Sequence, residues 1–210
     1  MDEERDGKLA RIEEKLDLLK RVEAEHGFGV IIEEPRKLEP IPELPEGVTE
    51  VFSLFHRLGG DYFRFEQPPE ITDRRSWADR PVNPHCPLGN PLSIGCERHG
   101  VPEDIDAGNT DICLDLRDGD VYSYLPDDYV FAYKNGEEFI EVTELAPDIV
   151  TFFDVCVLGA GYPRLVESVI GGHALTLRRR RGRRARPGRH RDSWMSLLEA
   201  SGLIPPMDPH

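Results

Sequence analysis

The strongest local constraint on the fold is a hairpin pattern in residues 111–125, "DICLDLRDGDVYSYL". Two apolar runs flank Asp118-Gly119, a pair that suits a two-residue turn requiring positive φ. The expected cross-strand pairs are Leu116 with Val121, Leu114 with Ser123, and Ile112 with Leu125. One face of the hairpin is then almost wholly aliphatic, because side chains alternate along a strand. The other face carries Asp115, Tyr122, Cys113 and Tyr124.

A second hairpin is predicted from residues 129–142, "YVFAYKNGEEFIEV", with Asn135-Gly136 at its turn. The register would pair Phe131 with Ile140 and Ala132 with Phe139. Two hairpins in series predict an antiparallel β-meander.

Helical spacing predicts an amphipathic N-terminal helix over residues 3–25 that ends near Gly27. Its apolar stripe is Leu9, Ile12, Leu16 and Leu19. The stripe is narrow, and it leaves open whether the helix packs on the body or pairs with a second copy.

The next segments read as a proline-rich extended connector, residues 35–47, and a second helix stopped by Gly59-Gly60. The buried face of that helix is predicted to be Val48, Val51, Phe52 and Phe55. Short strands are expected at "DYFRF" and "PLSIGCE", separated by a long irregular segment, residues 67–91. Loops of that length are often binding elements.

Three helices are expected in the last third of the chain. The first has Pro147 at its first position and Asp148 at its positive end, and stops at Gly159. Its core stripe is Ile149, Phe152, Phe153 and Cys156. A short helix follows over residues 161–171. The last is capped by Asp192 and buries Trp194, Leu197 and Leu198.

This order of elements predicts an α+β fold, an antiparallel meander flanked by helices. We divide the chain into an N-terminal helix and extension (1–34), an α+β domain (35–170), an arginine-rich linker (171–191), and a C-terminal helix and tail (192–210).

The charge distribution favours a basic protein partner. The whole chain has a formal charge of −14, but residues 1–177 hold 17 basic and 37 acidic residues, a charge of −20. A body of that charge repels phosphate backbones and attracts basic surfaces.

Residues 178–191, "RRRRGRRARPGRHR", carry nine arginines and no aromatic residue. Three interpretations remain open: the tract binds nucleic acid, folds back on the acidic body, or simply connects two parts. The tract has no aromatic side chain on which bases could stack, and Gly182, Pro187 and Gly188 disfavour a continuous basic helix.

The N-terminus is charged and lacks the apolar stretch of a signal peptide, and no apolar run is long enough for a membrane span. We therefore expect a cytoplasmic protein with reduced, widely spaced cysteines. His85, Cys86, Cys96 and His99 are weak candidates for a zinc site, because their spacing lacks the usual paired knuckle. We expect no metal, no cofactor and no catalytic set.

The candidate partner-binding residues are aspartates predicted to lie in loops at the ends of the meander strands. These are Asp104, Asp106, Asp111, Asp118, Asp120, Asp127 and Asp128. Such carboxylates either steer and anchor a basic partner or merely keep the protein soluble.

Four pieces of residues 40–163, taken in order, resemble the SUKH superfamily of bacterial immunity proteins and eukaryotic cell-wall regulators. They are "LPEGVTEVFSLFHRLGGDYFRF", "PLSIGC", "TDICLDLRDGDVYSY" and "ELAPDIVTFFDVCVLG". The positions carried over are structural: Gly59 and Gly60 for a turn, and Asp115, Gly119 and Tyr122 for the hairpin.

The resemblance implies a non-enzymatic protein that neutralises a toxin, often a nuclease or deaminase, by direct binding. A scaffold or regulatory module of the same fold, or a nucleic-acid-associated protein using residues 178–191, remains the alternative. The oligomeric state stays open.

Overall fold

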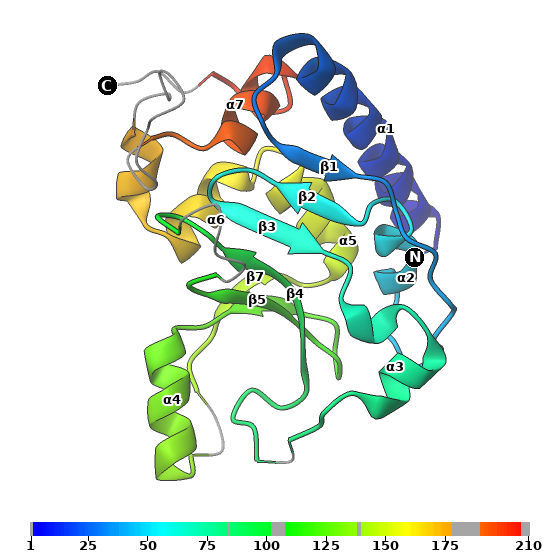
Figure 1. Cartoon of the computed structure of the whole chain (residues 1–210), viewed down its shortest axis with the longest axis vertical. Coiled ribbons are helices and arrows are strands. Elements are labelled where there is room, and N and C mark those ends of the chain that lie inside the picture. Colours follow the sequence, from blue (N-terminus) through cyan, green and yellow to red (C-terminus); the bar gives the residue numbers. More distant parts are fainter. Residues whose placement is uncertain (1, 84, 102–107, 138–139, 178–189, 207–210) are drawn as a thin grey trace.

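The computed structural model of the chain describes residues 2–83, 85–101, 108–137, 140–177 and 190–206 (Figure 1). Its centre is a seven-stranded antiparallel sheet whose strands follow one another in chain order. The strands are β1 (Ile31–Glu33), β2 (Arg57–Gly59), β3 (Phe63–Glu66), β4 (Pro91–Glu97), β5 (Asp111–Asp115), β6 (Val121–Ser123) and β7 (Thr143–Ala146). The predicted α+β meander is therefore confirmed.

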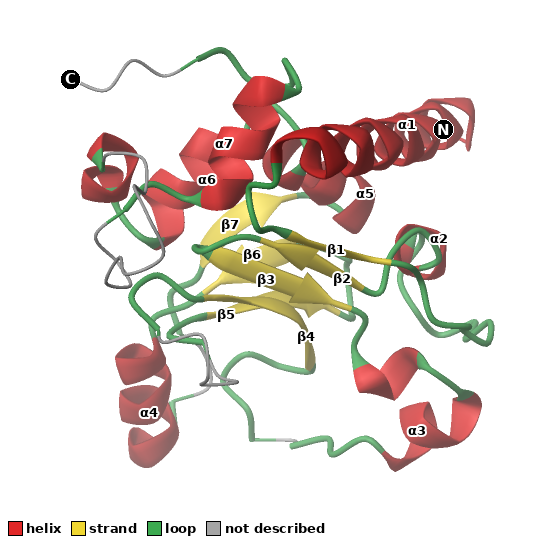
Figure 2. Ribbon diagram, turned by 45° about the horizontal axis from the view of Figure 1, so that its top comes forward, coloured by secondary structure: helices red, strands yellow, loops and turns green. Residues whose placement is uncertain are grey.

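Helices cover the two faces of the sheet unequally. On one face lie α1 (Asp2–His26), α5 (Ile149–Thr151), α6 (Tyr162–Val169) and α7 (Ser193–Ala200), whereas α3 (Arg74–Asp79) and α4 (Pro126–Asn135) lie on the opposite side (Figure 2). Shorter elements are α2 (Val48–Phe52), the 3₁₀ turns η1 (Pro69–Ile71) and η3 (Gly172–Thr176), and the π-helical turn η2 (Phe152–Val157), which continues α5. The main core fills the space between the sheet and the helices α1, α5, α6 and α7.

The main core follows from alternation along the strands. Phe63 and Phe65 of β3 are buried, as are Ile112 and Leu114 of β5, while the intervening Arg64 is half-buried. Side chains two residues apart share a face, so these strands direct one apolar row toward the helices. Parts far apart in the chain, including Ile12 of α1, contribute to the same core.

The first hairpin forms, but its register differs from the prediction by two residues. Leu114 pairs with Val121, and Ile112 with Ser123. The turn is wider than predicted because the main-chain N–H of Asp115 donates to the carbonyl of Asp120. A shift of two keeps every side chain on its predicted face, so the aliphatic face still enters the core.

Three of the positions carried over from the resemblance lie in this hairpin. The Asp115 carboxylate accepts hydrogen bonds from the main chain and the guanidinium of Arg117, which folds back along the turn. Gly119 adopts a left-handed φ of 88°. Tyr122 lies opposite Cys113 on the face away from the main core.

The prediction of a second hairpin is wrong, because residues 126–135 form α4. Pro126 occupies the first turn, and Gly136, with φ of 66°, ends the helix in the left-handed conformation. The N–H of Glu137 donates to the carbonyl of Ala132, a bond typical of a helix end. The proposed pairing of Phe131 with Ile140 therefore does not exist, and Phe139 lies outside the described residues.

The second helix is shorter than predicted. It ends at Phe52, and β2 occupies residues that were expected to be helical. The four predicted core residues, Val48, Val51, Phe52 and Phe55, are nevertheless all buried. Gly59 and Gly60 stand at the β2–β3 turn instead of stopping a helix: the N–H of Gly60 donates to the carbonyl of Phe63.

The other helix boundaries follow end signals in the sequence. Asp148 caps α5 by accepting from the N–H of Thr151, so Pro147 precedes the helix and is not its first residue. The expected short helix appears as α6, and α1 covers the predicted residues 3–25. Between η1 and β4, the expected irregular segment contains the short helix α3.

The N-terminal helix packs on the body of the same chain, which was the first of the two arrangements considered for it. Ile12, Leu16 and Leu19 are buried. Arg11 and Lys15 of α1 form ion pairs of 2.7 and 2.6 Å with the carboxylate of Asp154, which is buried. Burial alone would raise the pKa of Asp154, but the hydrogen bonds from these two cations outweigh it and lower the pKa.

The C-terminal helix enters the core through the predicted cap. One oxygen of the fully buried Asp192 carboxylate accepts from the main-chain N–H of Tyr62 at 3.0 Å. The other accepts from the N–H of Met195 at 3.1 Å and from the hydroxyl of Tyr162 at 2.5 Å. Trp194 is buried and donates its ring N–H to the carbonyl of Val157. Helix α7 is thus joined to the residue that precedes β3 and to the start of α6.

Tyr62 also brings together the two flanks of the arginine tract. Its hydroxyl oxygen lies 2.9 Å from the carbonyl oxygen of Ala174 and 3.1 Å from that of His190. The two carbonyl oxygens are therefore within about 6 Å of each other. Residues 178–189 lie outside the described residues, and the described residues on either side of them, Ala174 and His190, both approach Tyr62. The last arginine, Arg191, is buried and paired with Glu199.

Candidate protein-binding surface

The most exposed apolar surface in the described chain is on and beside α4. Four large side chains there face solvent: Leu125 (63% exposed), Val130 (45%), Phe131 (65%) and Tyr133 (53%). Scattered single apolar residues are normal on a surface, but several on one short helix mark an interaction site. Aromatic residues are also enriched where proteins bind one another.

Helix α4 is attached to the sheet through a small second hydrophobic cluster, separate from the main core. Its buried members are Leu88, Cys113 and Tyr122, and Cys86, Tyr124, Tyr129 and Ile140 pack against them. Ala132 is the buried residue of the helix itself. This satellite cluster joins the helix to β5 and β6, which carry Cys113 and Tyr122.

A row of tyrosines connects the satellite cluster to the exposed surface. The rings of Tyr124 and Tyr129 are 5.7 Å apart, and those of Tyr129 and Tyr133 are 6.1 Å apart and nearly parallel. Tyr133 is therefore held at its inner side by another ring. The hydroxyl of Tyr124 lies 3.4 Å from a carboxylate oxygen of Asp111.

The surroundings of α4 are acidic. Exposed carboxylates precede and follow the apolar residues, at Asp127, Asp128, Glu137, Glu141 and Glu144. The basic residue in the last turn of the helix is Lys134. The surface therefore combines apolar contact area with net negative charge.

The predicted aspartates divide between two ends of the first hairpin. Asp111 begins β5, and Asp127 and Asp128 follow the end of β6, so these three lie at the α4 end. Asp118 and Asp120 lie at the opposite end, in the turn. Asp104 and Asp106 lie outside the described residues. The described aspartates thus form two groups and not one array.

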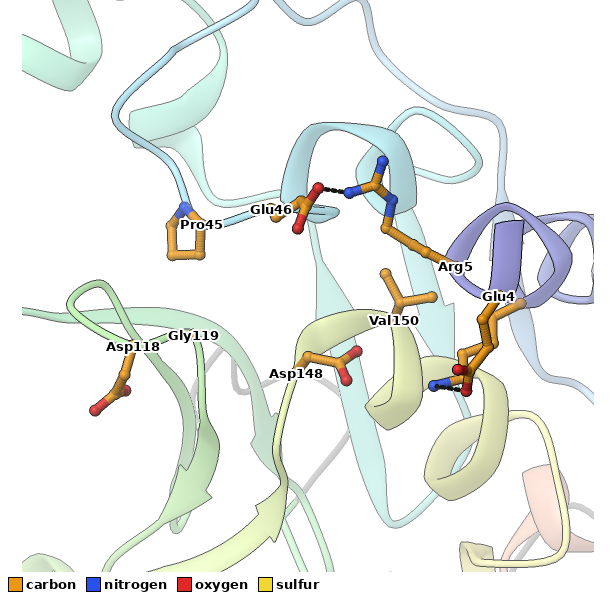
Figure 3. Close-up of a pocket in the computed structure, with 9 residues that line it drawn as sticks. Glu4, Arg5, Pro45, Glu46, Asp118, Gly119, Asp148 and Val150 are labelled. Atoms are coloured by element: carbon orange, nitrogen blue, oxygen red, sulfur yellow. Dashed lines mark ion pairs between the residues drawn. The ribbon is translucent and has the colours of Figure 1, made fainter. Parts of the chain in front are cut away.

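The turn that carries Asp118 borders an open cavity of about 280 Å³ (Figure 3). Arg5 of α1 reaches Glu46 across it, and Lys8 donates to the hydroxyl of Thr151 at 3.2 Å. Asp148 also lines the cavity, but its carboxylate caps α5. These side chains already bind one another, and the volume is below the roughly 300–1,000 Å³ typical of small-molecule sites. We interpret the cavity as a junction between elements.

The four residues considered for zinc are not brought together: in the part of the chain that the structure describes, no three His, Cys, Asp or Glu side chains form a metal-binding group. Cys86 packs in the satellite cluster, and His85 is exposed. His99 packs edge-on against Tyr62. Burial raises the pKa of the Cys96 thiol to about 11, so it is protonated at neutral pH.

The apolar residues of α4 are not among the sequence candidates, because the sequence analysis interprets their segment as a strand. The signals for a helix are nevertheless present: Pro126 at the start, Asp127 and Asp128 in the first turn, and Gly136 after the end. An interpretation as a helix would have shown Val130 and Phe131 on its outer side.

Comparison with known proteins finds no matching family model, no similar curated protein and no similar solved structure. Across the described ranges, no single helix has both the length and the apolar character needed to cross a membrane. Two consecutive helical segments, Ile149–Val157 and Tyr162–Val169, have that length and composition only when they are counted together, and the chain bends by 99° between them.

Proposed function

We propose that the protein is a non-enzymatic, SUKH-like binding protein that acts in the cytoplasm and neutralises a basic toxin domain by direct binding. The observation that carries the proposal is the exposed apolar face of α4 among carboxylates. Solvent-exposed Phe131 and Tyr133 offer contact area, and the acidic residues around them favour a basic partner.

A nuclease or a deaminase acting on nucleic acid fits this chemistry, because an enzyme that binds a polyanion has a basic surface. An acidic protein competes for that surface by resembling the charge of the substrate. The charge of −20 on residues 1–177 also favours a basic protein partner, and it opposes direct binding of nucleic acid by the body.

The test is coexpression with toxin domains encoded by neighbouring genes. We expect one of them to stop growth alone, growth to be restored when the full chain is coexpressed, and a 1:1 complex to copurify with a catalytically inactive form of that toxin. Failure of every neighbouring toxin to be neutralised or bound would overturn the immunity function. A stable complex with a non-toxic protein would favour a scaffold role.

A further inference from the structure

The position of α4 and the arrangement of its exposed apolar residues indicate the shape of the partner surface. The helix stands at the margin of the molecule and is attached along one side (Figures 1 and 2). At 3.6 residues per turn, Val130 and Phe131 lie on the side opposite Tyr129 and Ala132, which face the body. A convex helix presenting apolar residues fits a concave surface, the arrangement used when a helix binds in a groove.

The charges around α4 narrow the class of partner. Asp127 and Asp128 precede the apolar residues in the chain, Glu137 and Glu141 follow them, and all four are exposed, while Lys134 is the basic residue of the helix. A second copy would bring the same carboxylates face to face, and a nucleic acid would bring phosphates to them. Like charges facing each other across an interface are strongly unfavourable, so the partner must be basic around its groove.

The helix is also formed in advance of binding. Pro126 fixes its first turn, Gly136 ends it, and the rings of Tyr124, Tyr129 and Tyr133 support its inner side. An element ordered before association avoids much of the conformational cost of binding. The exposed aromatic residues can therefore act as anchors.

We infer that α4 docks as a preformed helix into an apolar groove rimmed by lysine or arginine residues on a basic protein, with Phe131 as its central anchor. This rests on the proposed function in naming a protein partner, but it does not require that partner to be a toxin. It separates two roles: Phe131 and Val130 hold the complex together, and the carboxylates speed its formation.

A photocrosslinking experiment tests the position and the chemistry of the contact. The full chain is expressed in its native cells with p-benzoylphenylalanine in place of Phe131, and in a control with the same residue in place of Val155. Val155 is a matched control because it is 42% exposed on η2, away from α4. We expect a crosslink from position 131, absent from position 155, to an apolar residue flanked by basic residues in a basic protein. No crosslink from position 131, or one to an acidic protein, overturns the inference.

The partner identified by crosslinking is then purified without a crosslink, and the kinetics of its binding to the full chain test the two roles. We expect Phe131→Ala to raise the dissociation rate about tenfold or more with little effect on the association rate. Asp127→Asn with Asp128→Asn should lower the association rate and weaken its dependence on salt. Val155→Ala should change neither. Unchanged dissociation of the Phe131→Ala variant overturns the inference even if neutralisation of a toxin is confirmed, and a non-toxic partner overturns the immunity function without affecting the inference.

Discussion

Asp192 joins three parts of the molecule through one carboxylate. It is fully buried and accepts hydrogen bonds from the main chain of Tyr62 and Met195 and from the hydroxyl of Tyr162. Burial is the main reason that its pKa rises from 3.8 to about 6, while the hydrogen bond from Tyr162 opposes the rise. The negative charge is therefore costly to bury above pH 6, although three donors face it.

The raised pKa predicts a particular pH dependence of stability. The folded chain binds the Asp192 proton more tightly than the unfolded chain, so this residue contributes more stability as the pH falls from 7 toward 4. The Asp192→Asn variant keeps a side chain that can cap the helix but has no proton to gain. Relative to this variant, the wild-type free energy of unfolding should rise by up to about 3 kcal/mol over that range. Urea unfolding at several pH values measures it, and two parallel curves would contradict it.

Gly60 is required where β3 meets the start of α7. A Cβ at this position would lie 2.6 Å from the main-chain nitrogen of Trp194 and 2.7 Å from the carboxylate of Asp192. We expect Gly60→Ala to lower the free energy of unfolding by about 3 kcal/mol, because buried backbone cannot move aside cheaply. Gly7→Ala is the control: it lies in α1 with the nearest atom 3.8 Å away, and it should stabilise the protein by up to about 1 kcal/mol. Chemical denaturation compares the two, and equal effects would refute the argument.

At the scale of elements, end signals predict helices better than alternation predicts strands. Asp192 and its helix, and the helix of residues 3–25, appear where the sequence places them. The prediction for residues 129–142 fails because Asn-Gly ends a helix as readily as it turns a hairpin, and both use a left-handed glycine. The short strands β1, β2 and β7 are missed, since tertiary pairing decides them, whereas the equally short β3 and β6 are predicted because an aromatic alternation and an Asp-Gly turn mark them.

The carbonyl oxygens of Ala174 and His190 both lie close to the hydroxyl of Tyr62. We therefore expect the arginine tract to be dispensable for folding. Replacing residues 178–189 with four Gly or Ser residues should leave the thermal midpoint within about 3 °C, because both flanks remain at the same point on the body. The same variant decides the nucleic-acid alternative. If wild type binds DNA or RNA in a salt-sensitive way and the variant does not, that alternative is correct; equal binding, or none by either, rejects it.

At the scale of the whole molecule, one core joins the two ends of the chain. Ile12 and Leu16 of α1 belong to the same cluster as Trp194 and Leu198 of α7. The sequence predicts the fold class and most core residues, because alternation and helical spacing report burial directly. It could not show which helices share a core, since that depends on contacts between distant segments.

Removal of the last helix should therefore unfold the whole molecule and not only its end. A chain that stops after residue 191 loses the buried Trp194, Leu197 and Leu198 and exposes the apolar surfaces that they cover. We expect it to lack the sharp thermal transition of the full chain by circular dichroism, while a chain that stops after residue 206 keeps it. A folded 1–191 fragment would show that the C-terminal helix is an accessory element.

The satellite cluster under α4 has a consequence for the time scale on which the molecule opens. A helix anchored by a few side chains outside the main core can detach without disturbing that core, at a small fraction of the cost of global unfolding. Amide protons of α4 should then exchange with deuterium long before those of β3 and β5. The proposed binding helix would belong to a unit that opens and recloses repeatedly during the lifetime of one folded molecule.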